Sequence, residues 1–163
     1  RVRSSAASDV YKRQEEWFEG ESNYIEGLYF PGYGKEDANR DIGDSAITET
    51  MGIGGFAMGG APAIVQFVGG TTDDALAVSR KMYSICVDSN PAYALPSLNF
   101  KGSAMGIDML KVIETGILPI INTGIAHKNA GVGQIGAGIV SPPMECFYKA
   151  LLAYVRKYTS GNE

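Results

Sequence analysis

The sequence has 163 residues, of which 45% are hydrophobic and 20% charged, a composition typical of one globular domain with a buried core. No apolar run reaches the roughly 20 residues of a membrane-spanning helix, and the formal net charge of −4 argues against a nucleic-acid partner. Cys86 and Cys146 lie far apart without metal-ligand spacing, and His127 is the only histidine, which excludes a zinc site. We therefore expect two buried, reduced thiols in a cytoplasmic protein that does not enter a membrane.

The first 14 residues, RVRSSAASDVYKRQ, differ in character from the rest of the chain. They resemble translated sequencing-adapter read-through, which occurs at the ends of genes assembled from metagenomic data, so we expect 1–14 to be a disordered artefact. This segment is basic, so the remaining residues are more acidic than the whole chain. We expect 15–163 to be the C-terminal portion of a longer protein.

The first predicted element is a strand. Residues 24–30 are rich in aromatic and aliphatic side chains and predict a strand, which the proline- and glycine-containing turn 31–34 ends. A charged and irregular segment, 35–44, follows.

A short helix is predicted next, over 44–50, with Asp44 or Ser45 as its capping residue. Glycines interrupt it, and a second helix is expected near Phe56. The apolar run 63–68 suits a helix or a buried strand, because its spacing does not decide between them.

The middle of the chain contains the clearest helix signal. Residues 71–74 (TTDD) predict a capped helix start, and apolar residues then recur at helical spacing until Asn90 and Pro91, which we expect to end the helix. Residues 93–100 predict a strand, and 101–106 a loop.

The last third alternates between helix and strand. We expect a helix over 108–115, a strand over 117–122, a long glycine-rich loop over 123–138, a short strand end at 139–140 and a final helix opened by Pro142 and Pro143. The predicted fold class is therefore α+β, with mixed helices, short strands and long glycine-rich loops.

The main candidate site is the polar stretch 122–138, which is expected where a strand ends and where open α/β sheets bind ligands. His127 can transfer a proton near neutral pH, and Lys128 can hold an anion. Residues 131–138 (GVGQIGAG) resemble a phosphate-binding loop whose backbone N–H groups face the anion, but no helix follows at once, so a dinucleotide site is not expected. The alternative is a surface loop with an incidental histidine.

We expect His127 to be a catalytic residue of this stretch. The substrate-binding residues predicted there are Asn122, Thr123, Gly124, Lys128, Gly131, Gly133, Gln134 and Gly136.

A second candidate site is the helix start at 44–50, where Ser45 and Glu49 share one face. Asp44, Ser45 and Thr50 are predicted to bind substrate, and Glu49 is predicted to be catalytic. For Asp44 and Ser45 the alternative is that they only cap the helix, which would explain both residues. Lys101 is a third candidate for binding an anion, and a solvated lysine is the alternative. No cofactor or resident metal is predicted. A Mg²⁺ ion that enters with a substrate phosphate is the one metal that the sequence leaves open.

These motifs resemble those of the YlbE-like family, a bacterial family of unknown function. The resemblance covers nearly everything after residue 14 and rests on 27–34 (GLYFPGYG), 36–39 (EDAN), 41–50 (DIGDSAITET), 54–58 (GGFAM), 64–70 (IVQFVGG), 90–91 (NP), 106–108 (GID), 114–128 (ETGILPIINTGIAHK), 131–138 (GVGQIGAG) and 143–147 (PMECF). Family members are much longer than this chain. The resemblance therefore implies that the chain is the C-terminal part of a larger, multi-part α+β protein.

One branch of this family, AllG-like, is a subunit of oxamate carbamoyltransferase in anaerobic allantoin degradation, a route of purine catabolism. Its partners are an FdrA-like subunit related to acyl-CoA synthetases and a third subunit, and carbamate kinase uses the carbamoyl phosphate product. The resemblance implies carbamoyl transfer here, with a small anionic substrate such as carbamoyl phosphate or oxamate. It assigns no catalytic residues.

The predicted residues are compatible with that chemistry, which needs fixed donors for phosphate and carbonyl oxygens and a group that moves a proton. The loop 131–138 would supply N–H donors, and His127 would polarise the carbonyl or move the proton. Lys128 or Lys101 would pair with the anionic group, and Glu49 would hold the amide nitrogen.

Two other functions stay open. The chain can be a non-catalytic scaffolding or binding subunit of an FdrA-like synthetase complex, or a ligand-binding protein of unrelated purine or amide metabolism. If the chain is part of a longer protein, apolar surface that faces the remainder is expected to be exposed.

Overall fold

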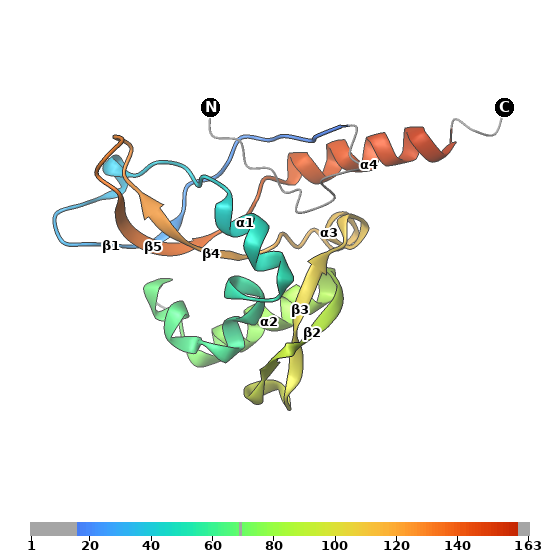
Figure 1. The fold of residues 1–163 in the computed structure, drawn as a ribbon, viewed down its shortest axis with the longest axis horizontal. Helices are drawn as coiled ribbons and strands as arrows, with labels where there is room; N and C mark the ends of the chain where they lie inside the picture. The colour runs from blue at the N-terminus through green and yellow to red at the C-terminus, as the bar shows by residue number, and fades with distance from the viewer. Residues whose placement is uncertain (1–15, 69, 160–163) are drawn as a thin grey trace.

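The computed structural model describes residues 16–68 and 70–159, and it confirms the predicted α+β class (Figure 1). The segment 1–14, predicted to be an artefact, lies outside the described residues. The strands form two antiparallel sheets. One sheet has the order β1-β5-β4, with bounds Glu26–Tyr29, Gln134–Val140 and Ile121–Ala126; the other pairs β2 (Cys86–Leu95) with β3 (Lys101–Ile107).

Helices lie between and beside these sheets (Figure 1). The α-helices are α1 (Asp44–Thr48), α2 (Thr72–Ile85), α3 (Met109–Thr115) and α4 (Met144–Thr159). Short 3-10 helices are η1 (Lys35–Asp37), η2 (Glu49–Met51), η3 (Gly54–Gly60), η4 (Pro62–Val68) and η5 (Pro96–Leu98). None of the helices in the described part of the chain is both long and apolar enough to cross a bilayer.

The core fills the space between α2, η3 and the two sheets. Its largest fully buried side chains include Phe56, Met82, Ile85, Ile121 and Ile125. The start of α2 is fixed by a reciprocal cap, in which the Asp74 carboxylate accepts from the Thr71 N–H at 2.7 Å and the Thr71 hydroxyl accepts from the Asp74 N–H at 3.3 Å. The cap that the sequence predicts at 71–74 is thus confirmed.

Other predicted elements are confirmed as well. The predicted strand 24–30 contains β1, and α3 begins after its cap, Asp108, and ends at Gly116, whose φ is 68°. The final helix, α4, starts directly after the two prolines. Both cysteines are free and buried, as expected.

Two predictions around β2 and β3 are wrong. The helix α2 ends at Ile85 and not at Pro91, because the chain enters β2 at Cys86. Pro91 is accommodated within β2 because the register of the ladder shifts between Asn90 and Ala94, where backbone pairing is interrupted. The predicted loop 101–106 is the strand β3.

The predicted glycine-rich loop over 123–138 is also wrong, because most of it forms the hairpin of β4 and β5. The strand β4 begins at Ile121, later than predicted, and its alternate residues Ile121, Thr123 and Ile125 point inward. Gly138 lies in the central strand β5, and β1 passes so close to it that a Cβ atom there would overlap the Glu26 carbonyl oxygen. Close packing of the two strands therefore requires a glycine at this position. The connection between β4 and β5 is therefore only 127–133, which we call the hairpin tip.

Candidate functional site

The structure separates the predicted site residues into three places. The hairpin tip carries His127 and Lys128, the start of β4 carries Asn122 beside Glu49, and Lys101 begins β3 in the other sheet. Five residue steps separate Asn122 from His127 along β4, a distance of roughly 17 Å in an extended strand. The structure therefore does not unite all the predicted residues in one site.

The hairpin tip is attached to η1. Ala38 forms an isolated antiparallel bridge with His127, and the Lys128 N–H donates to the Asp37 carbonyl at 2.7 Å. The Lys128 ammonium donates to the Glu36 carbonyl at 2.6 Å and lies 3.8 Å from the Asp37 carboxylate. Lys128 thus fastens the tip to η1, which leaves it less available for an anionic ligand than predicted.

His127 has a defined orientation at the tip. Its Nδ1 accepts a hydrogen bond from the Asn129 N–H at 2.9 Å, so the neutral ring carries its proton on Nε2. The Tyr33 ring meets the His127 ring edge-on, with centroids 5.8 Å apart. The partly exposed imidazole therefore presents Nε2–H as a donor to a ligand.

The expected N–H cradle of 131–138 is reduced to the hairpin tip. The residues of β5 from Gln134 onward lie in a central strand that is paired with β4 and β1, so their N–H groups serve the ladders. The Gln134 side chain donates to the Gly136 carbonyl at 2.8 Å and lies over Gly124. Gly131 and Gly133 lie in the tip itself, with open space around them.

Glu49 and Asn122 lie together at the start of β4, where the sequence predicts the end of a strand. The Glu49 side chain is 5% exposed, and its Oε2 accepts hydrogen bonds from the N–H groups of Gly55 and Asn122, both at 2.9 Å. Burial raises the pKa of Glu49 to about 7; the two N–H donors oppose this rise, and the negative charges of Asp41 and Asp44 add to it. Glu49 is thus a buried carboxyl group that changes charge near neutral pH.

The prediction that Asp44 or Ser45 caps the helix α1 is wrong. The residue before α1 is Gly43 in the left-handed conformation, with φ of 87°, and neither Asp44 nor Ser45 caps the helix with its side chain. The Ser45 carbonyl instead accepts from the Glu49 N–H, and the Thr50 hydroxyl donates to the Ile47 carbonyl at 2.8 Å. Asp44 is the first residue of the five-residue helix α1, and it is exposed.

Lys101 lies apart from the other predicted residues. Its ammonium lies 3.9 Å from the centroid of the Tyr83 ring, and the Tyr83 hydroxyl donates to the Gly102 carbonyl at 2.6 Å. Lys101, at the start of β3, thus lies over the Tyr83 ring of α2.

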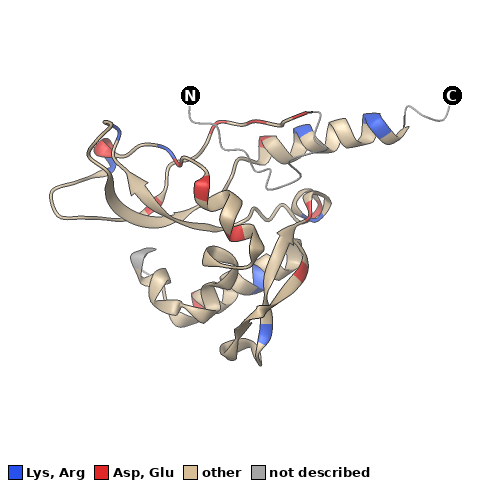
Figure 2. Ribbon diagram, viewed as in Figure 1, with Lys and Arg blue, Asp and Glu red and all other residues tan. Residues whose placement is uncertain are grey.

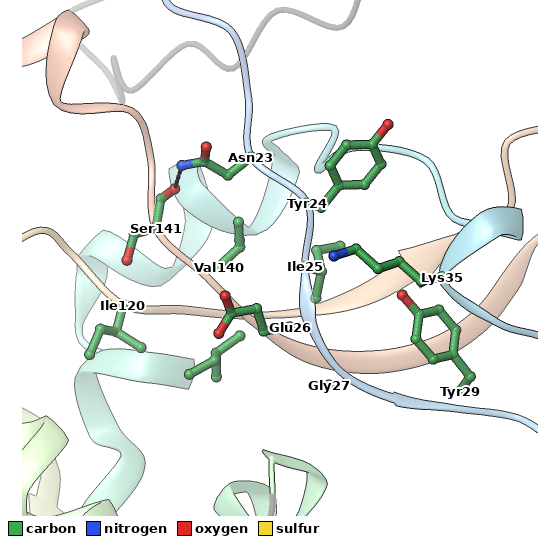
Figure 3. Close-up of a pocket in the computed structure, with 11 residues that line it drawn as sticks. Asn23, Tyr24, Ile25, Glu26, Gly27, Tyr29, Lys35, Ile120, Val140 and Ser141 are labelled. Carbon is green, nitrogen blue, oxygen red and sulfur yellow. Dashed lines mark hydrogen bonds between the residues drawn. The ribbon is translucent and has the colours of Figure 1, made fainter.

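A pocket that the sequence did not predict opens beside β1, next to η1 and the end of β5 (Figure 3). Its volume is about 520 Å³. It is lined by Asn23, Tyr24, Ile25, Glu26, Gly27, Tyr29, Lys35, Ile120, Ile139, Val140 and Ser141. One edge is held by the Asn23 side chain, which donates to the Ser141 carbonyl at 2.8 Å.

The pocket contains one positive and one negative charge. In Figure 3 the Lys35 side chain reaches from η1 toward Ile25, and the Glu26 carboxylate lies on the side of Val140. Within the described residues, neither the Lys35 ammonium nor the Glu26 carboxylate has an ion pair or hydrogen bond. Both charges are therefore available to a ligand.

The element η1 connects this pocket to the hairpin tip. It begins at Lys35, which lines the pocket, and it is followed by Ala38, which bridges to His127. Figure 2 shows acidic and basic residues mixed where η1 meets the tip. The pocket thus runs along β1 from Lys35 and Tyr29, which lie toward the hairpin tip, to Ile139, Val140 and Ser141, which lie at the opposite end of β5 from the tip.

Comparison with known proteins finds relatives of this chain. A family described as "Oxamate carbamoyltransferase subunit AllG" matches residues 8–45. The chain is 54% identical over 143 residues to "Uncharacterized protein YahG" of Escherichia coli (strain K12), which covers 88% of this chain and 30% of YahG. It is 53% identical over 148 residues to "Oxamate carbamoyltransferase subunit AllG" of the same organism, which covers 90% of this chain and 35% of AllG.

Over about nine tenths of its length the chain is therefore similar to AllG and YahG. The sequence resemblance to AllG-like proteins is thus confirmed. A crystal structure of a conserved protein of unknown function from Enterococcus faecalis V583 has the same fold, with a TM-score of 0.81 and 54% sequence identity over 86% of this chain and 33% of that one. The chain therefore spans about one third of the length of these relatives.

Proposed function

We propose that this chain forms the substrate pocket of an oxamate carbamoyltransferase-like subunit, which acts in a complex with an FdrA-like subunit and a third subunit. The observation that carries the proposal is the unpaired Lys35 and Glu26 in one pocket. Its support from outside the structure is the 53% identity to AllG.

The two charges suit a small anion that also carries an amide. Carbamoyl phosphate combines phosphate with an amide, and oxamate combines a carboxylate with one. An ammonium such as that of Lys35 binds the anionic group, and a carboxylate such as that of Glu26 accepts from the amide N–H. The pocket is large enough for such a ligand with its first waters.

The proposed reaction moves a carbamoyl group between a phosphate oxygen and the oxamate nitrogen. In the direction of transfer to oxamate, a C–N bond forms, the C–O bond to phosphate breaks, and the proton lost by the nitrogen is taken up by the phosphate, which leaves as hydrogen phosphate. The carbonyl oxygen gains negative charge in between, and the Nε2–H of His127 is the donor proposed to stabilise it. The burial of Glu49 and its two backbone hydrogen bonds favour a positioning role for this residue, which holds the start of β4.

The substitution Lys35→Met tests the pocket. It keeps most of the length of the side chain and removes the charge, so carbamoyl phosphate should bind at least about tenfold more weakly to the full-length subunit, as measured by calorimetric titration. The control, Lys101→Met, removes a cation from the other sheet and should leave the affinity within about twofold. Equal affinities for the parent and the Lys35 variant would overturn the proposed pocket.

The substitution His127→Ala tests the proposed donor. In the assembled full-length complex it should lower kcat by about 10²-fold, the usual effect of removing one such donor. The neighbouring Asn129→Ala serves as the control, because only the backbone N–H of Asn129 contacts His127. Unchanged turnover in the histidine variant would remove His127 from the reaction and favour a scaffolding role for the tip.

A further inference from the structure

The helix α4 has an apolar face that runs along its whole length. Phe147, Leu151, Tyr154, Val155 and Tyr158 recur at helical spacing on one side, and the stretch 150–155 between Lys149 and Arg156 carries no charge. In Figure 2 this stretch is the tan part of α4 between its basic residues. The sequence thus predicts a helix that is covered over all four turns.

The described part of the chain covers only the beginning of this face. Phe147 is 6% exposed, whereas Leu152 is 55%, Tyr154 49% and Tyr158 63% exposed. Figure 1 shows why: α4 extends away from both sheets toward the C-terminus. A continuous apolar surface of this kind is typical of an interface.

A groove of about 570 Å³ continues this surface toward the N-terminal segment. Trp17, which is 50% exposed, and Phe18 line it on one side, and Leu152 and Ala153 line it on the other. Its edge is held by Lys149, whose ammonium donates to the Glu19 carbonyl at 2.8 Å. The exposed face therefore combines α4 with a second segment and is wider than one helix.

We propose that this face, which we call the α4 face and define by Trp17, Leu152, Tyr154, Val155 and Tyr158, packs against the part of the AllG/YahG polypeptide that lies outside the matched third. The matched stretch covers only 30% of YahG, 35% of AllG and 33% of the Enterococcus faecalis protein. Sequence in the same polypeptide competes for such a face at a far higher effective concentration than a second copy or a separate subunit. The proposal rests on the similarity to AllG and YahG and is independent of the proposed carbamoyl transfer.

Cysteine protection in a full-length protein tests the α4 face. This chain replaces the matched third of Escherichia coli AllG, to which it is 53% identical, and carries Leu152→Cys on the α4 face or Lys157→Cys on the opposite side of α4 as the control. Iodoacetamide should modify the cysteine at 152 at least tenfold more slowly than the one at 157, at every protein concentration and without other subunits. Cys86 and Cys146 are buried in both variants.

Three results would overturn the proposal. They are equal rates at both positions, protection at 152 that disappears on dilution, which indicates a second copy, and protection that arises only when the other subunits are added. If the chimera does not fold, hydroxyl-radical footprinting of full-length AllG and YahG gives the same answer, because the residues aligned with Leu152, Tyr154 and Tyr158 should be oxidised at least tenfold more slowly than the residue aligned with Lys157 once each rate is divided by the intrinsic reactivity of its side chain. Equal oxidation would overturn it.

Discussion

Glu49→Gln is expected to be more stable than the parent chain at about pH 8 and equally stable near pH 4.5, since the pKa of Glu49 is raised from 4.5 to about 7 in the folded chain. The raised pKa means that the folded state holds the proton more tightly than the unfolded state does. The stabilisation is therefore fully present below about pH 4.5 and is lost as the pH rises through about 7. The loss corresponds to about 3 kcal/mol of unfolding free energy at most.

Glutamine removes this dependence because it stays neutral, and its amide oxygen can accept from the same N–H groups of Gly55 and Asn122. Glu49→Ala leaves both donors buried without a partner and should destabilise the chain by about 1–3 kcal/mol for each. Urea denaturation at several pH values measures both effects, with the exposed Glu114→Gln as the control. Parallel pH profiles for the parent and Glu49→Gln would contradict this account of Glu49.

Gly138→Ala is expected to destabilise the fold by about 3 kcal/mol, whereas Gly131→Ala should cost only about 1 kcal/mol. At Gly138 a Cβ atom would overlap the backbone of β1, and neither strand can move away without breaking the ladder. At Gly131 the space is open and the cost is that of a φ of 87° alone. Urea unfolding midpoints measure the difference.

This pair of substitutions also separates two roles of the glycines. Both belong to the pattern 131–138 that resembles a phosphate-binding loop. If the pattern were an anion cradle, Gly131→Ala would weaken carbamoyl phosphate binding and Gly138→Ala would affect stability no more than Gly131→Ala does. Equal destabilisation would therefore contradict the strand role of Gly138.

The elements that the sequence predicts best have local signals. Thr71 and Asp74, which lie within four residues of each other, form the cap that predicts the start of α2. Asp108 caps the start of α3 and Gly116 ends it, so both ends of that helix also have local signals. The hairpin of β4 and β5 was missed because its glycines suggest a loop, although Ile121, Thr123 and Ile125 alternate as a strand does. Close packing between strands is a tertiary property that glycine content alone does not reveal.

The candidate site follows the same division. Both Glu49 and Asn122 could be singled out from the sequence, although Asn122 lies at the start of β4 and not at the end of a strand as predicted. The pocket could not, because its walls come from β1, from η1 and from the end of β5. Lys35 gave no signal of its own in a charged segment, and only the fold shows that it lines the same pocket as Glu26.

Hydrogen–deuterium exchange of the full-length subunit with carbamoyl phosphate tests the central claim most directly. The pocket predicts slower exchange in peptides that cover 23–29 and 33–38, which contain Glu26 and Lys35, and no such slowing in Lys35→Met. Peptides over 101–107, which contain Lys101, should be unaffected. Protection confined to segments outside 23–38 and 139–141, or protection that survives Lys35→Met, would contradict the assignment of this pocket as the substrate site.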